Sequence, residues 1–136
     1  RAAEARPRLE EAINKKPEEE GYALALARAD MTLQDFSRVD ALLLPFFGQA
    51  KPPRYEVFNL LANAHHRTGE REKALKVIEQ GISHYGLNTG FLNLRGDCYL
   101  KMGKLTEALL ALEKSLELNP AQPEVQKAVE ELKKKD

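Results

Sequence analysis

Apolar side chains recur every three or four residues along most of this chain, which is the spacing that places them on one face of an α-helix. Short stretches containing Gly, Pro or Asn interrupt the pattern, and no segment shows the strict alternation of a β-strand. The pattern therefore predicts an all-α protein. Its eight predicted helices cover residues 2–16, 18–33, 35–47, 54–68, 71–85, 89–102, 105–118 and a last segment from 123 into the lysines at 133–135.

Prolines mark two of these helices. Pro17, followed by Glu18, Glu19 and Glu20, suits the first turn of the second helix, where a missing N–H costs nothing and the positive helix end favours carboxylates. Pro45 removes a hydrogen bond inside the third helix, so we expect that helix to bend or to end early. The links between helices are short, and short links make consecutive helices run antiparallel. The chain is thus predicted to be a series of helical hairpins.

The hairpins repeat in sequence. Residues 69–75 read GEREKAL and residues 103–109 read GKLTEAL, so the second copy follows the first at a shift of 103 − 69 = 34 in the numbering. The same shift aligns the apolar and small positions of two hairpins, namely Phe58, Leu61, Ala62, His65, Ala74, Ile78, Gly81 and Gly86 with Leu92, Arg95, Gly96, Tyr99, Ala108, Leu112, Ser115 and Pro120. A weaker upstream copy contains Ala23, Leu26, Ala27, Asp30, Val39 and Leu43, and a partial copy contains Ala5, Leu9, Ala12 and Pro17.

This pattern resembles the tetratricopeptide repeat, in which a Trp-like residue, Leu-Gly, Tyr, Ala, Phe and a closing Pro follow one another over about 34 residues. The resemblance implies a right-handed α-solenoid of antiparallel helix hairpins, a TPR-like superhelix formed by a single domain of residues 1–136. Its predicted parts are the second helix of a preceding repeat (1–19), three repeats (20–54, 55–88 and 89–122) and a capping helix (123–136). Arg95 stands where the family has Leu, and His65 where it has Tyr. We expect the head of Arg95 to reach solvent or a carboxylate.

Small residues occupy the positions where the two helices of a hairpin must approach closely: Ala62, Ala74, Gly96 and Ala108. Gly96 inside a helix costs about 1 kcal/mol relative to Ala. We therefore expect close helix packing to require a glycine there.

The resemblance further implies that the first helix of each hairpin lines a concave groove that binds extended peptides. The polar positions of these helices give the predicted groove residues: Arg28, Met31, Glu56, Asn59, Asn63, His66, Arg67, Asn93, Asp97 and Lys101. Asn59 and Asn93 stand at the same position of successive repeats, and an amide can pair with a peptide backbone whatever its sequence, because it offers a donor and an acceptor. The cationic members could attract a carboxylate. The alternative interpretation is that this stripe is the solvated side of the helices.

The balanced net charge argues against two classes of binding partner, nucleic acids and membranes. The 21 Lys and Arg balance the 21 Asp and Glu, which argues against nucleic-acid binding and against polybasic attachment to a membrane. No apolar run approaches the roughly 20 residues that cross a bilayer. Because the sequence starts at Arg1 without an initiator Met or a signal peptide, we expect an excised fragment. Its compartment stays open, with the cytoplasm favoured.

The His, Cys and Glu residues that could act in catalysis or bind a metal are not spaced as such a site requires. His65 and His66 are adjacent on a helix, so they point in different directions and do not form a metal site. Cys98 occupies a small interior position, which favours a buried, inert thiol over a nucleophile. Glu10 and Glu11 are successive helix residues and are interpreted as solvated charge. We therefore predict no catalytic residue, no metal and no cofactor.

These observations predict a non-catalytic protein–protein interaction module whose partner is a protein surface or a peptide segment held in the groove. The alternative is self-association, or a structural accessory domain of a larger protein, through the first helix. That helix carries apolar residues but no hairpin mate to cover them: Ala2, Ala5, Leu9, Ala12 and Ile13.

Overall fold

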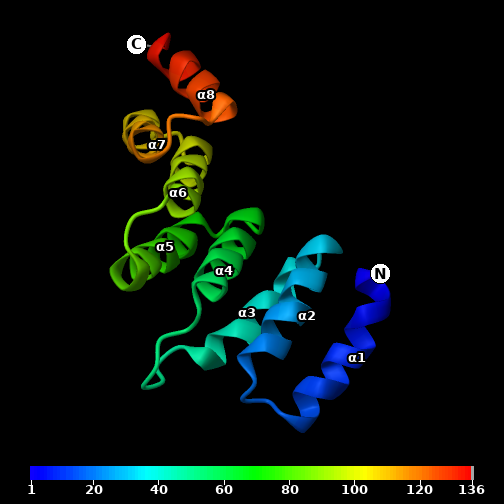
Figure 1. Ribbon diagram of the computed structural model, residues 1–136. Helices are drawn as coiled ribbons and strands as arrows, with labels where there is room; N and C mark the ends of the chain where they lie inside the picture. Colours follow the sequence, from blue (N-terminus) through cyan, green and yellow to red (C-terminus); the bar gives the residue numbers. More distant parts are fainter. Residues whose placement is uncertain (136) are drawn as a thin grey trace. The chain divides into compact units, whose positions relative to one another are not determined.

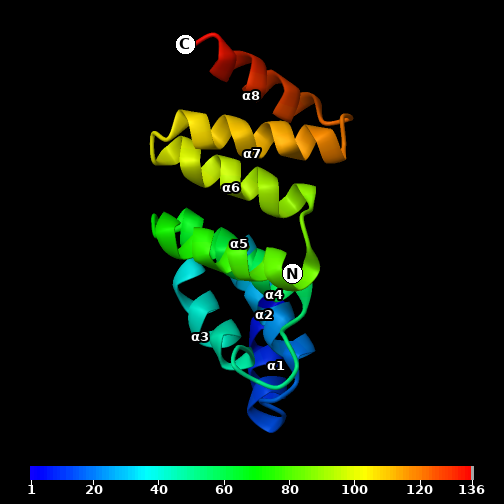
Figure 2. The ribbon, with the colours of Figure 1, turned by 90° about the vertical axis from the view of Figure 1, so that its left-hand side faces the viewer.

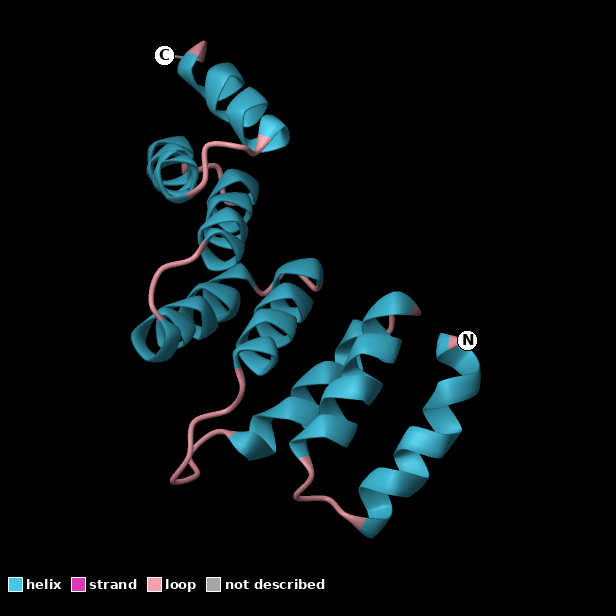
Figure 3. Ribbon diagram, viewed as in Figure 1, coloured by secondary structure: helices cyan, strands magenta, loops and turns pink. Residues whose placement is uncertain are grey.

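A computed structural model of the chain describes residues 1–135 (Figures 1 and 3), so Asp136, the last residue of the predicted capping helix, lies outside the described residues. Within this range the regular elements are all helices, and the all-α prediction is confirmed. The α-helices are α1 (Ala2–Lys15), α2 (Glu20–Thr32), α3 (Val39–Leu43), α4 (Tyr55–Arg67), α5 (Arg71–Tyr85), α6 (Thr89–Lys101), α7 (Leu105–Leu118) and α8 (Pro123–Lys133). Two 3₁₀ turns flank α3, η1 (Phe36–Arg38) and η2 (Leu44–Phe46).

The chain divides into two compact units, a first unit of residues 1–74 and a second unit that starts at Leu75. In the first unit α1 packs on α2, and α2 and α3 both contact α4. In the second unit α6 and α7 lie side by side as an antiparallel hairpin, and α8 packs on α7 (Figure 2). Within the units, α1 pairs with α2, α2 with α3, α6 with α7 and α7 with α8, as the short links predicted.

Each unit has an apolar interior built largely from the positions that the repeat aligned and their neighbours. In the first unit the large apolar side chains exposed by 1% or less are those of Leu24, Leu26, Val39, Leu43, Val57, Phe58 and Leu61. In the second unit they are those of Ile78, Phe91 and Leu92. The small residues Ala62, Ala74 and Ala108 are fully buried, as expected for positions where helices approach closely.

The first helix of each hairpin ends in the same turn. The turn has one residue in the left-handed backbone region and a hydrogen bond that reaches five residues back, which is the Schellman arrangement. The left-handed residues are Gln34, Gly69 and Gly103, with φ of 60°, 87° and 77°. The long bonds run from the N–H groups of Asp35, Glu70 and Lys104 to the carbonyls of Asp30, His65 and Tyr99, at 2.8, 2.8 and 2.9 Å. Recurrence of one turn at this spacing is independent structural support for the repeat.

Two of the predicted helix boundaries change in the structure. The helix predicted over 35–47 is divided into η1, α3 and η2, and Pro45 lies in η2, so the expected early end is found. The prediction that Pro17 belongs to the first turn of the second helix is wrong. α2 begins at Glu20, and the N–H of Glu19 instead donates to the carbonyl of Lys16 (3.1 Å) in a separate turn. This turn gives the N–H group of Glu19 a hydrogen-bond acceptor before α2 begins.

The last helix, α8, has one apolar and one polar side. Val129 and Leu132 are buried against α7 together with half-buried Val125 and Ala128. One repeat on from Leu92, Gly96 and Tyr99, the matching positions hold Gln126, Glu130 and Lys133, and these residues are exposed. A polar outer side is what a helix that caps a repeat stack requires for solubility.

Gly96 lies at a close contact between α6 and α7. A β-carbon placed on it would come within 2.7 Å of Leu112 Cδ2 and 2.8 Å of Leu112 Cγ. Gly81 likewise faces the ring of Phe91, where a β-carbon would clash. The packing requirement expected for a glycine within α6 is therefore present.

We predict that Gly96→Ala lowers the free energy of unfolding by about 1–3 kcal/mol, because the new methyl group displaces Leu112. Helix propensity alone predicts the opposite sign, a gain of about 1 kcal/mol. Ala62→Gly at the same repeat position of α4 is the matched control, and it should cost about 1 kcal/mol through propensity. Urea denaturation followed by circular dichroism measures both changes, and a Gly96→Ala variant as stable as the parent would contradict the packing argument.

Candidate interaction surfaces

Two of the predicted groove residues, on neighbouring helices of the first unit, contact each other. Arg28 on α2 donates from Nε (3.0 Å) and from Nη2 (2.7 Å) to Oε2 of Glu56 on α4. Their side chains are 49% and 52% exposed, so the pair contributes little to stability. The pair connects the exposed sides of α2 and α4, and both charges remain accessible to a ligand.

The asparagines of the stripe are engaged in two different ways. On α4, Nδ2 of Asn63 donates to the backbone carbonyl (3.0 Å) and to Oδ1 (3.1 Å) of Asn59. On α6, Nδ2 of Asn93 donates to Oε1 of Gln122 (2.9 Å), while Oδ1 of Asn93 is buried and has no hydrogen-bond partner among residues 1–135. Asn59 and Asn93 thus have different surroundings, although they share a repeat position.

The other predicted groove residues are placed as follows. The guanidinium of Arg67 lies 4.7 Å from the centre of the Phe36 ring, a cation–π contact at the end of α4. Met31 on α2 and His66 on α4 are half-buried, and Asp97 and Lys101 on α6 are exposed. The structure therefore brings together a polar set in the first unit, Arg28, Glu56, Asn59 and Asn63. The positions on α6 form a separate set in the second unit.

Sequence reasoning missed a group of buried ionisable residues at the repeat position where the family has Tyr. This position holds Asp30, His65 and Tyr99, and the first two are 0% and 5% exposed. Oδ1 of Asp30 lies 3.0 Å from Nε of Arg6 on α1, and burial raises the pKa of the Asp30 carboxyl more than the Arg6 guanidinium lowers it. Asp and His at a repeat position where the family has Tyr were the available signal.

His65 faces carboxylates at both ends of its ring. Nε2 lies 3.2 Å from Oδ1 of Asp40, and Nδ1 lies 3.4 Å from Oε1 of Glu70. A hydrogen bond from Lys73 (2.8 Å) lowers the pKa of Glu70, with a smaller contribution from His65. Because α3, α4 and the following turn each supply one member, this cluster holds the hairpin turn of the first unit to α3.

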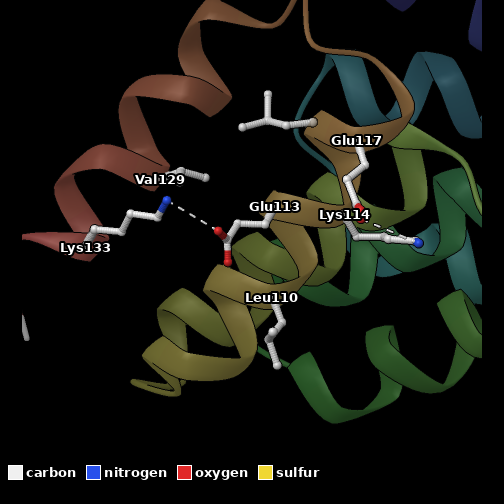
Figure 4. Close-up of a pocket in the computed structure, with 7 residues that line it drawn as sticks. Leu110, Glu113, Lys114, Glu117, Val129 and Lys133 are labelled. Carbon is white, nitrogen blue, oxygen red and sulfur yellow. Dashed lines mark ion pairs between the residues drawn. The ribbon is translucent and has the colours of Figure 1, made fainter.

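A shallow hollow of about 650 Å³ lies between α7 and α8 (Figure 4), away from the predicted groove residues. Leu110, Leu116 and Val129 line it together with two ion pairs. Glu113 on α7 pairs with Lys133 on α8 (3.4 Å), and Lys114 pairs with Glu117 (3.5 Å). The charges of this hollow are thus balanced within the chain.

Metal-ligating and thiol side chains form no chemical site in the described part of the chain. Among residues 1–135, no three His, Cys, Asp or Glu side chains converge as metal ligands would. The thiol of Cys98 is fully buried, as expected. None of the helices described is both long enough and apolar enough to cross a membrane.

Known tetratricopeptide repeat sequences and solved structures resemble this chain. Sequence models of the tetratricopeptide repeat match residues 57–84 and 91–122. The solved structure of a MamA RS-1 ArsTM double mutant is similar, with a TM-score of 0.82 and 17% identity over 96% of this chain and 73% of that chain. A thermophilic TPR protein of Thermus thermophilus has a TM-score of 0.55 and 17% identity, over 97% of this chain and 90% of that chain. No curated protein sequence matches the chain. At this identity the structural likeness shows the fold.

We predict that the free energy of unfolding of Asp30→Asn, relative to that of the parent, is highest near neutral pH and decreases as the pH falls. Because the folded state raises the pKa of Asp30, it binds the proton more tightly than the unfolded state, so the parent gains stability as pH falls through that raised pKa. Because the Asn side chain does not titrate, the variant gains no stability from this position over this pH range. Urea denaturation near pH 7 and near pH 4 gives the difference in unfolding free energy.

The matched variant is Arg6→Gln, which leaves Asp30 buried without its counter-charge. It should destabilise the first unit by about 1–3 kcal/mol at neutral pH, since Arg6 itself is only 25% exposed. An Asp30→Asn variant that instead gains on the parent at low pH would show that desolvation does not dominate at this site.

Proposed function

Because the chain belongs to the tetratricopeptide repeat family, whose repeats in general mediate protein–protein interactions, we propose that it holds a peptide segment of a partner protein against the first helices of its hairpins. The single observation that carries the proposal is the polar set on α2 and α4. There Arg28 and Glu56 join two helices at an exposed pair, and Asn59 and Asn63 continue the set along α4.

The polar set is suited to exchange its internal bonds for bonds to a ligand. A side-chain pair at i and i+4 on an exposed helix stabilises by only about 0.2–0.5 kcal/mol, so a peptide carbonyl can replace Asn59 as the acceptor for Asn63 at small cost. On α6, Oδ1 of Asn93 is an unused acceptor among the described residues. A buried acceptor without a donor costs about 1–3 kcal/mol, which a peptide N–H would recover once the Asn93 side chain turned to expose this oxygen.

The partner is proposed to be a protein and the role to be binding without catalysis. Among the predicted groove residues, Arg28, Arg67 and Glu56 carry charge on the first unit, and Lys101 and Asp97 carry charge on the second. A site of mixed charge suits a peptide with polar side chains, whereas a nucleic acid or an anionic membrane requires a strongly basic surface. No cofactor is needed for this role.

We expect the double variant Asn59→Ala with Asn93→Ala to bind the partner about tenfold more weakly, since two hydrogen bonds of ordinary strength are lost. The melting temperature should fall only slightly, because both side chains are half-buried and the variant loses only their bonds to Asn63 and Gln122 within the described chain. An unbiased pull-down with the parent chain identifies the partner, and calorimetry with that partner then measures the parent and the variant. Asn14→Ala, at an exposed asparagine of α1, is the matched control. Equal affinity of parent and double variant would rule out a role for the amides.

The first helix supports a second candidate, self-association or packing onto a larger parent protein. None of the α1 residues is fully buried, and Ala5 and Leu9 line a hollow of about 370 Å³ together with Arg1, Glu4 and Arg8. The five apolar residues expected to lack cover are half-buried against the first unit: Ala2, Ala5, Leu9, Ala12 and Ile13.

If α1 mediates self-association, the sedimentation coefficient should rise with protein concentration, because apolar surface would be buried between copies. Analytical ultracentrifugation over about a hundredfold range of concentration measures this. Arg8→Glu, which changes the charge beside that hollow, should shift the dimerisation equilibrium, whereas a monomer throughout would exclude the candidate.

A further inference from the structure

We infer that the second unit carries another interaction surface, at Arg95, and that it takes a segment of a partner protein in which an apolar side chain lies next to an aspartate or glutamate. This surface lies on α6 and α7, and none of the groove residues predicted from the sequence lines it. Its test uses different variants, so this inference and the proposed function can fail independently.

Arg95 is unusual for its position. The same repeat position holds Leu26 and Leu61, and each of these leucines is 1% exposed in the interior of the first unit. Arg95 is half-buried, and its guanidinium makes no hydrogen bond or ion pair with any of residues 1–135. The partly buried arginines of the first unit, Arg6 and Arg38, are instead each paired with a carboxylate. A planar guanidinium offers the best geometry for binding a carboxylate through two hydrogen bonds.

A hollow of about 300 Å³ lies directly beside Arg95. Leu92 and Ala111 contribute buried side chains to its lining, exposed by 1% and 5%, whereas Leu87 and Leu110 on its edge are 46% and 63% exposed. Covering such apolar surface is favourable by about 25 cal/mol per Å². The volume is at the lower end of the range for ligand sites, so it suits one or two inserted side chains.

The charges around this hollow favour an acidic occupant. Arg95 and Lys114 line it on the positive side and Glu107 on the negative side, which leaves an excess of one positive charge. Lys114 is 48% exposed and, within the described chain, is held only by Glu117 at 3.5 Å (Figure 4), so it can turn toward a ligand at small cost. Leu110 and Lys114 are one helical turn apart on α7. An apolar residue seated on Leu110 therefore brings a neighbouring carboxylate within reach of a cation.

A structural explanation of Arg95 makes a different prediction. The aliphatic stem of an arginine can cover apolar surface while its head stays in water. On that account the charge has no ligand, and replacing Arg95 by the leucine of the other repeats would change stability alone. The two explanations are therefore separated by binding measurements.

The probe is a panel of labelled eight-residue peptides in which one Leu or Phe is followed or preceded by Asp at a distance of one to four residues. A matched panel carries Asn in place of Asp. Fluorescence anisotropy with the whole chain measures the affinities. Amide chemical shifts in NMR spectra of the ¹⁵N-labelled chain identify the surface that is contacted.

We expect at least one acidic peptide to bind about tenfold more tightly than its Asn counterpart, which is the effect of one charge-assisted contact. The shifted amides should lie within 92–99 and 107–114. Arg95→Leu should reduce the acidic peptide to the affinity of the neutral one while the melting temperature stays equal or rises. Arg95→Gln gives the same test if the leucine variant does not fold. Leu110→Ser should weaken the binding of both the acidic and the neutral peptide. Arg95→Lys should retain part of the preference for the acidic peptide.

Three results would overturn the inference. One is that no peptide of the panel binds the parent chain more tightly than its neutral counterpart. Another is that Arg95→Leu and Arg95→Gln bind the acidic peptides as tightly as the parent does. The third is that the shifted amides lie on α2 and α4, which would assign the binding to the proposed peptide site.

Discussion

The close approach of paired helices is the constraint on which this structure depends. At Gly96 the side chain of Leu112 occupies the space that a β-carbon would need, so any larger residue at this position of α6 would force Leu112 to move. Ala62, at the equivalent position of α4, is fully buried, and so are Ala74 and Ala108 at the small positions of α5 and α7. A hairpin with larger residues at these positions would hold its helices apart and open a gap that its leucines could not fill. The surfaces proposed for binding exist because these contacts set the spacing of the helices that carry them.

The two units stabilise one repeat position by different means. In the first unit it holds Asp30 and His65, whose charged or polar atoms face Arg6, Asp40 and Glu70. In the second unit it holds Tyr99, which packs beside the cluster around Leu112. Buried ion pairs add little net stability, because desolvation offsets attraction, but removing one partner is costly. The first unit is therefore expected to depend more strongly on pH and salt.

Both proposed binding surfaces use side chains that the fold does not need for its interior. On α2 and α4 these are an exposed ion pair and a pair of asparagines, and beside α7 they are an arginine without a counter-charge among the described residues and an exposed leucine. The first combination suits contacts with the backbone and polar side chains of a peptide. The second suits a partner segment with one apolar side chain next to one acidic side chain. A chain with balanced total charge can thus present sites of different local charge.

The amino-acid sequence by itself determined the helices, the spacing of the repeat, the small residues at helix contacts and the departure at Arg95. These features depend on local periodicity and on identity at a repeated position, and both can be read along one chain. Only the tertiary structure decided which polar side chains meet. Arg28 and Glu56 are 28 residues apart, and Asn93 and Gln122 are 29 apart. The polar contacts of buried Asp30 and His65 were missed for the same reason. Their partners lie on neighbouring helices, and helical spacing says which face a residue occupies but not what packs against that face.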